Sequence, residues 1–229
     1  MAKQTYFGPE LFTFLRLLKK NNNREWFQMN KGRYESDVRD PMLRFIADFT
    51  APLHGISNRF KADPRPQGGS LFRIYRDTRF SRDKSPYKIM AAAHFRHEAG
   101  AGVHAPGFYL HLEPGEVFAA VGIWHPDLDT LSKIRDAILS RPDTWKRITT
   151  AAKFKQTWTF WGESYKRPPA GVEPTHPLIG DLKRKDFVVT APFTEQDARS
   201  PRFLEQVAEA YRSASAFAKF LVQSLGLRY

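Results

Sequence analysis

Apolar residues at helical spacing characterise the first quarter of the chain. Pro9 suits the first turn of a helix, and four apolar residues that share one face follow it: Leu11, Phe14, Leu15 and Leu18. The polar run at 19–23 ends this helix, and similar patterns predict a second helix from Arg24 and a third from Pro41 that ends before Pro52. The N-terminal quarter is therefore predicted to be helical.

Strand-like patterns follow in the middle of the chain. Five stretches show period-two alternation or enrichment in Val, Phe and Thr: 88–97, 107–113, 116–124, 157–161 and 187–191. Pro114 and Gly115 supply a tight turn between the second and third of these stretches. The pattern predicts a β-meander within a mostly antiparallel sheet.

Helical patterns return after the meander. The first begins near Asp127, and its predicted inward face consists of Leu128, Leu131, Ile134 and Ile138. Pro142 begins a short helix, and a long C-terminal helix is predicted from a Ser200 cap to Gly226. Because the sequence contains no repeat and no long linker, this order predicts a single α+β domain over residues 1–229, with helices from the N-terminus, middle and C-terminus packed on the sheet.

Composition narrows the classes of function. The 229 residues carry a formal net charge of +12, which favours anionic partners such as phosphates or nucleic acid. The chain contains no cysteine, so disulfides, thiolate nucleophiles and cysteine-based zinc sites are excluded. The N-terminal stretch fits neither a signal peptide nor a membrane span, because Arg16 interrupts its apolar residues. We therefore expect a cytoplasmic protein with no membrane partner.

Positive charge concentrates in residues 72–88, which we call the arginine tract. It sets six cations against Asp77 and Asp83, a local excess of four (6 − 2): Arg73, Arg76, Arg79, Arg82, Lys84 and Lys88. Crowded cations repel one another unless acids or an anionic ligand neutralise them. We predict a strand to about Arg76 followed by a loop, in which the six cations, with Ser81, bind a phosphate or carboxylate. The alternative is that both aspartates pair with the arginines and pin the loop. The glycine spacing of a P-loop is absent.

A polar sheet face is predicted beside the tract. Alternation places Tyr109, His111 and Glu113 on one face of their strand, and the preceding strand presents His94 and Arg96 on a single face. His titrates near neutrality and a nearby Glu can orient it, so His111 and His94 are the candidate acid/base residues, and Tyr109 joins the anion-binding set. A metal held by His94, His111 and Glu113 is a further alternative, but no recognised ligand spacing supports it and no metal is assigned. The remaining alternative is a solvated, hydrogen-bonded sheet face.

Cations and aromatic residues also alternate at 153–161, followed by Lys166 and Arg167. Bases stack on aromatic rings while cations follow phosphates, so this segment is compatible with single-stranded nucleic acid. A buried strand would equally contain Trp158 and Phe160, and core packing is the favoured interpretation.

Three segments resemble a known family. Residues 22–27, the run 76–88 and the run 106–115 resemble an uncharacterised family of bacterial and fungal proteins catalogued as domain of unknown function 2461. The resemblance spans nearly the whole chain and implies one domain across it. It implies no activity, cofactor or catalytic residue.

The expected function is binding of an anionic small molecule in a basic cleft between the arginine tract and the polar face of the 88–113 strands. The alternatives are a nucleic-acid-associated basic protein and a scaffold or interaction module. No motif in the sequence names a reaction or a cofactor.

Overall fold

The computed structural model describes residues 4–100 and 105–229, so the first three residues of the N-terminal stretch lie outside the described residues. The N-terminal helices are α1 (Pro9–Lys20), α2 (Arg24–Met29), α3 (Lys31–Tyr34), the π-helical η1 (Glu35–Arg39), α4 (Asp40–Asp48) and α5 (Thr50–His54). The strands are β1 (Phe60–Lys61), β2 (Ala91–His97), β3 (Gly107–Glu113), β4 (Glu116–Ile123), β5 (Thr159–Trp161) and β6 (Phe187–Phe193). The later helices are α6 (Leu128–Ser140), α7 (Pro142–Thr150), α8 (Ala152–Thr157), α9 (Ile179–Leu182), α10 (Glu195–Ala198), α11 (Phe203–Ser213) and α12 (Ser215–Ser224).

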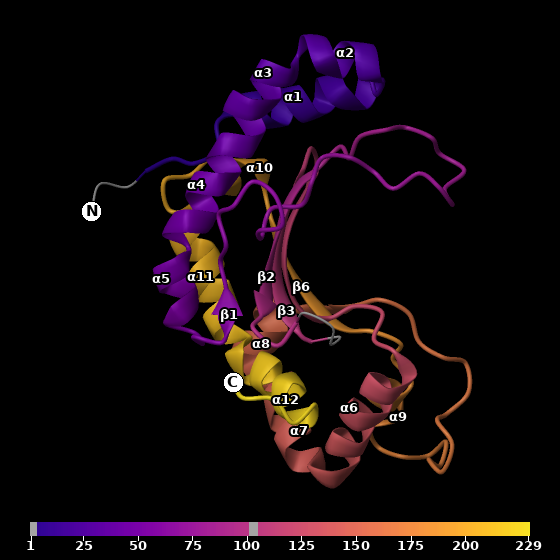
Figure 1. The fold of residues 1–229 in the computed structure, drawn as a ribbon. Coiled ribbons are helices and arrows are strands. Elements are labelled where there is room, and N and C mark those ends of the chain that lie inside the picture. Colours follow the sequence, from indigo (N-terminus) through magenta and orange to yellow (C-terminus); the bar gives the residue numbers. More distant parts are fainter. Residues whose placement is uncertain (1–3, 101–104) are drawn as a thin grey trace.

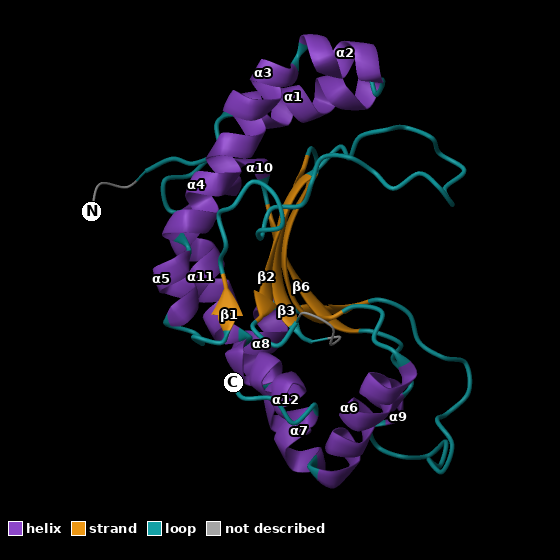
Figure 2. Ribbon diagram, viewed as in Figure 1, coloured by secondary structure: helices purple, strands orange, loops and turns teal. Residues whose placement is uncertain are grey.

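The strands form one antiparallel sheet in the order β1-β2-β3-β4-β6-β5. The meander of β2, β3 and β4 lies at its centre, as the alternation predicts, and Gly115 forms the tight β3–β4 turn with a φ of +85°. Figures 1 and 2 show α4, α5 and α11 along one face of this sheet, which confirms the α+β fold class.

One hydrophobic core lies between the sheet and these helices. It includes Phe95 of β2, Phe108 of β3 and Val121 of β4, which share the core with Phe49 between α4 and α5 and with Tyr211 of α11. The opposite face of the sheet carries the alternate residues, and Figure 1 shows no described helix packed along the middle of this face. We call this second face the open face; the arginine tract and the 162–178 loop both project on its side (Figure 1).

The C-terminal helix departs from its prediction. A single helix from Ser200 to Gly226 is wrong, because the chain forms α11 and α12 with a break at Ala214. The two helices have different neighbours: α11 packs on α5 and α8, whereas α12 packs on α6 and α7. A straight helix cannot follow both surfaces.

Other differences are local. Leu128 was expected on an inward face but is 77% exposed, because it is the first residue of α6 and projects beyond the layer that buries Leu131. The predicted strand up to Arg76 is reduced to isolated bridges at Leu71 and Tyr75. The strand predicted from residue 157 begins at Thr159, after the short helix α8. No helix among the described residues is long and apolar enough to cross a membrane.

Candidate functional site

The open face brings together the polar residues predicted from alternation. His94 of β2 lies opposite Tyr109 of β3, and Ala92 lies opposite His111, so the two histidines stand in adjacent cross-strand rows. Glu113 ends β3 on the same face and lies opposite Glu116 at the start of β4. Strand pairing therefore places two imidazoles, a phenol and two carboxylates on one surface.

His111 is held firmly within this group. Its Nδ1 lies 2.9 Å from the Tyr109 hydroxyl, and the Phe118 ring stacks on the imidazole with centroids 4.6 Å apart. Its Nε2 lies 3.5 Å from Glu113 Oε2. Burial lowers the pKa of His111 and raises the pKa of Tyr109, since both side chains are largely removed from water. A neutral imidazole between a phenol and a carboxylate can accept or relay a proton.

His94 has different surroundings. The Phe72 ring stacks on it, and its Nδ1 accepts a hydrogen bond from Arg96 Nε at 3.3 Å. Burial lowers the pKa of His94 to about 4, so its neutral form dominates at neutral pH. A Cβ at Gly107 would overlap the His94 imidazole, so the glycine provides the space in which this ring lies.

Both aspartates of the arginine tract form internal ion pairs. Arg79 donates to Asp77 at 2.7 Å, and Arg76 pairs with Asp83. The hydrogen bonds from Arg79 lower the pKa of the Asp77 carboxyl to about 2. The alternative, in which the aspartates pair with arginines of the tract and pin the loop, therefore holds for Arg76 and Arg79.

The other predicted anion ligands lie in separate places. Lys88 Nζ donates to the backbone carbonyls of Arg73 and Tyr75, and Lys84 Nζ donates to that of Thr78. Arg73 and Arg82 form no ion pair with a described residue, and Ser81 is the uncharged member of the tract set. The tract thus keeps its excess positive charge but spreads it along an extended loop.

One part of the tract lines a pocket of about 290 Å³, which we call the tract pocket. Its lining combines residues of α2 with both ends of the tract: Arg24, Gln28, Tyr75, Arg76, Thr78, Pro86 and Tyr87. Arg76 is the member of the predicted anion-binding set in this lining, whereas His94, Tyr109 and His111 lie elsewhere on the open face. The two halves of the predicted cleft are therefore distinct features of the surface.

Asn22 and Arg24 are residues that the site prediction omitted. Asn22 Nδ2 donates to the Tyr87 carbonyl at 2.9 Å, and its Oδ1 accepts from the Tyr87 amide at 3.1 Å. Asn23 caps α2 by accepting from the Trp26 amide, which sets Arg24 at the first helical position beside the tract. The asparagine pair before a helix was a signal available in the sequence, but its partner 65 residues away was not.

The 153–161 segment, in which cations and aromatic residues alternate, is divided between the core and the surface. Trp158 is buried and donates from Nε1 to Ser213 Oγ at 2.9 Å, as the core interpretation expects. Trp161 is 52% exposed and Trp124 is 61% exposed, with ring centroids 6.5 Å apart. Tyr165, Lys166 and Arg167 follow Trp161 in the chain and line a second pocket, and we call these three residues, with Trp124 and Trp161, the aromatic-basic patch.

The chain matches a family model over most of its length. The family model described as "Conserved hypothetical protein (DUF2461)" matches residues 10–220, which confirms the resemblance noted from the three segments. Searches of curated proteins and of solved structures found no match.

Proposed function

The chain belongs to the DUF2461 family of conserved hypothetical proteins, and we propose that it binds a small anionic ligand, bearing phosphate or carboxylate, in the tract pocket. The observation that carries the proposal is the lining of that pocket. It contains Arg24 and Arg76 and the polar side chains of Gln28 and Thr78, and none of the described residues that line it carries a carboxylate. Guanidinium groups recognise phosphate and carboxylate through paired hydrogen bonds.

The two arginines differ in their freedom. Asp83 pairs with Arg76 Nη1 and thereby fixes the direction of that guanidinium, while no described residue hydrogen-bonds to its other guanidinium N–H groups. Arg24 is exposed and forms no ion pair with a described residue, so its charge is uncompensated. An incoming anion would meet one oriented and one free guanidinium.

Tyr87 anchors one wall of the pocket. Tyr87 is buried and stacks on Phe27 of α2 with centroids 4.0 Å apart, and Asn22 holds its backbone. Tyr75 packs against Tyr87 at 5.4 Å. Because this wall is held in place before a ligand arrives, a ligand that packs against it need not order it, which lowers the entropic cost of binding.

A melting-temperature screen with phosphorylated and carboxylated metabolites at constant ionic strength tests the proposal. A ligand that raises the melting temperature should bind the Arg24→Gln variant about tenfold more weakly or worse, since one charge-assisted hydrogen bond contributes about 1.5–3 kcal/mol. Lys153→Gln is the matched control, because it removes one exposed positive charge from α8, away from the pocket. Equal loss in both variants, or no stabilising anion, would refute the proposal.

A second candidate function, binding of single-stranded nucleic acid, is favoured by the aromatic-basic patch. Trp124 and Trp161 expose rings on which bases can stack, and Lys166 and Arg167 lie beside a pocket of about 490 Å³ that Arg135 also lines. Titration with a single-stranded oligonucleotide should quench tryptophan fluorescence. The binding measured in this way should weaken steeply with salt and be lost in Trp161→Ala. Unchanged binding by this variant would exclude the patch, and a small anion in the tract pocket should show a shallower salt dependence.

A further inference from the structure

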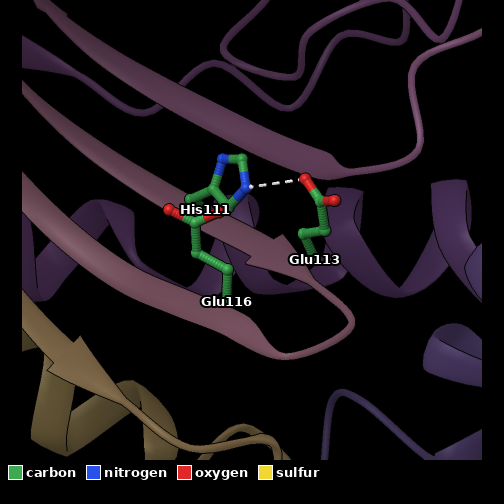
Figure 3. Close-up of side chains that lie close together, drawn as sticks. All are labelled: His111, Glu113 and Glu116. Atoms are coloured by element: carbon green, nitrogen blue, oxygen red, sulfur yellow. Dashed lines mark ion pairs between the residues drawn. The ribbon is translucent and has the colours of Figure 1, made fainter.

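The turn of the β3–β4 hairpin gathers three groups that can bind a metal ion. His111 and Glu113 lie two residues apart on β3 and point to the same face, and Glu116 lies directly opposite Glu113 on β4. Nitrogen and oxygen atoms from the three side chains lie within 4.8 Å of one another (Figure 3). These atoms face each other on the open face of the sheet.

The imidazole supplies a buried nitrogen without a hydrogen bond, whose carboxylate neighbour, Glu113 Oε2, lies 3.5 Å away, too far for a good hydrogen bond (Figure 3). His111 is 9% exposed, and no described residue forms a hydrogen bond with its Nε2. Leaving a buried polar atom without a partner is costly, and such atoms are rare in folded proteins. The ring cannot turn away, because Tyr109 holds Nδ1 and Phe118 stacks on its face. This nitrogen therefore stays directed at the carboxylates.

The two carboxylates create a second unfavourable feature. Like charges directly opposite each other in an antiparallel pair destabilise the sheet. Lys19 lies 4.0 Å from Glu113 Oε1, but its side chain is largely exposed and compensates only part of this repulsion. A bound cation would satisfy Nε2 and neutralise the paired glutamates at the same time.

We propose that His111 Nε2 and the carboxylates of Glu113 and Glu116 bind one divalent transition-metal ion, with Zn²⁺ preferred over Mg²⁺. An imidazole ligand selects transition metals over Mg²⁺, which prefers oxygen and water. Ligand atoms about 2.1 Å from Zn²⁺ at a tetrahedral angle lie about 3.4 Å apart, and His111 Nε2 and Glu113 Oε2 are 3.5 Å apart. Glu116 is exposed and has the rotamer freedom to complete the set.

Tyr109 is the positioning residue of this site. With Nδ1–H donated to the phenol oxygen, the Nε2 lone pair points at the metal, as ligating histidines in proteins are commonly arranged. Three protein ligands leave a coordination position for water or another ligand. His94, which the sequence placed in a candidate metal set, is engaged by Arg96 and Phe72 instead.

Calorimetric titration of the full-length chain, first freed of metal with a chelator, tests the site with Zn²⁺ as the probe. We expect one equivalent of Zn²⁺ to bind, and Glu113→Gln or Glu116→Gln to weaken it at least about tenfold. His54→Gln is the matched control, because His54 is an exposed histidine at the end of α5. Mg²⁺ should give no heat at the same concentrations.

Two further variants separate this site from general loss of structure and from the tract pocket. Tyr109→Phe should keep the fold, as seen by circular dichroism. It should weaken Zn²⁺ binding about 10–100-fold, because His111 Nδ1 loses its hydrogen-bond partner. Arg24→Gln should leave Zn²⁺ binding unchanged, so failure of the anion proposal does not affect this test. Equal Zn²⁺ affinity in the wild type and both glutamine variants, or loss that appears equally in His54→Gln, would overturn the proposal.

Discussion

The backbone at Gly122 gives the sharpest test of the sheet. Gly122 lies next to the last residue of β4 with a φ of +135°, a region that residues with a side chain rarely adopt. A Cβ there would overlap the carbonyl oxygen of Phe187 on β6 and lie 2.9 Å from the Val188 Cα. Both neighbours are backbone atoms of a paired strand, so they cannot turn aside as a flexible side chain would.

The expected cost of Gly122→Ala follows from these two effects. Forcing a residue into such a backbone region costs about 1–3 kcal/mol, and overpacking against fixed atoms costs about 1–3 kcal/mol more. The free energy of unfolding should therefore fall by about 2–6 kcal/mol, a large share of the roughly 5–15 kcal/mol of a typical domain.

Urea unfolding followed by circular dichroism and tryptophan fluorescence measures this change, with two glycines as controls. Gly115→Ala shares a positive φ of +85° but meets no atom within 4 Å, so it should cost only about 1–2 kcal/mol. Gly180→Ala, in α9 with open space around it, should be neutral or stabilising by up to about 1 kcal/mol. The usual effect of a point mutation is about 1 kcal/mol. If the free energies of unfolding of Gly122→Ala and Gly180→Ala differ by less than about this amount, the backbone geometry of β4 at Gly122 is incorrect.

Three further predictions concern the core and two titrating groups. Trp145 is fully buried and donates a hydrogen bond to Asp181 at 2.9 Å, so Trp145→Ala should lower the free energy of unfolding in urea by about 3–5 kcal/mol. A similar loss in Trp161→Ala, the control at an exposed site, would contradict this prediction. His94 should titrate near pH 4 by NMR. Because the unfolded chain takes up this proton near pH 6.5, the contribution of His94 to stability falls as the pH drops from 6.5 to 4. A titration midpoint above pH 6 would show that the ring is not buried. The Asp77 carboxyl should titrate near pH 2 rather than 3.8; its contribution to stability is present above about pH 4 and is lost towards pH 2, and an ordinary midpoint would mean that Arg79 does not pair with it.

Local pattern was sufficient for much of the fold. The first helix, the meander and its turn at Gly115 follow from spacing, because a helix or strand buries one face and exposes the other over consecutive residues. The common face of Tyr109, His111 and Glu113 follows from the same period of two. Leu128 shows the limit, since apolar spacing does not tell where the covering layer ends.

What the chain's sequence determined on its own was the type of most of the longer elements, the alternation of the meander strands and the excess of positive charge in the arginine tract. Tertiary structure alone decided that Asn22 holds Tyr87, that Arg24 joins Arg76 at one pocket, and that Glu116 lies opposite Glu113 near His111 Nε2. It also decided that the tract aspartates pair with Arg76 and Arg79. The physical reason is the range of the interactions: helix and strand periodicity act between neighbours in sequence, whereas pockets, ion pairs and ligand sets depend on which distant segments the packed core brings together.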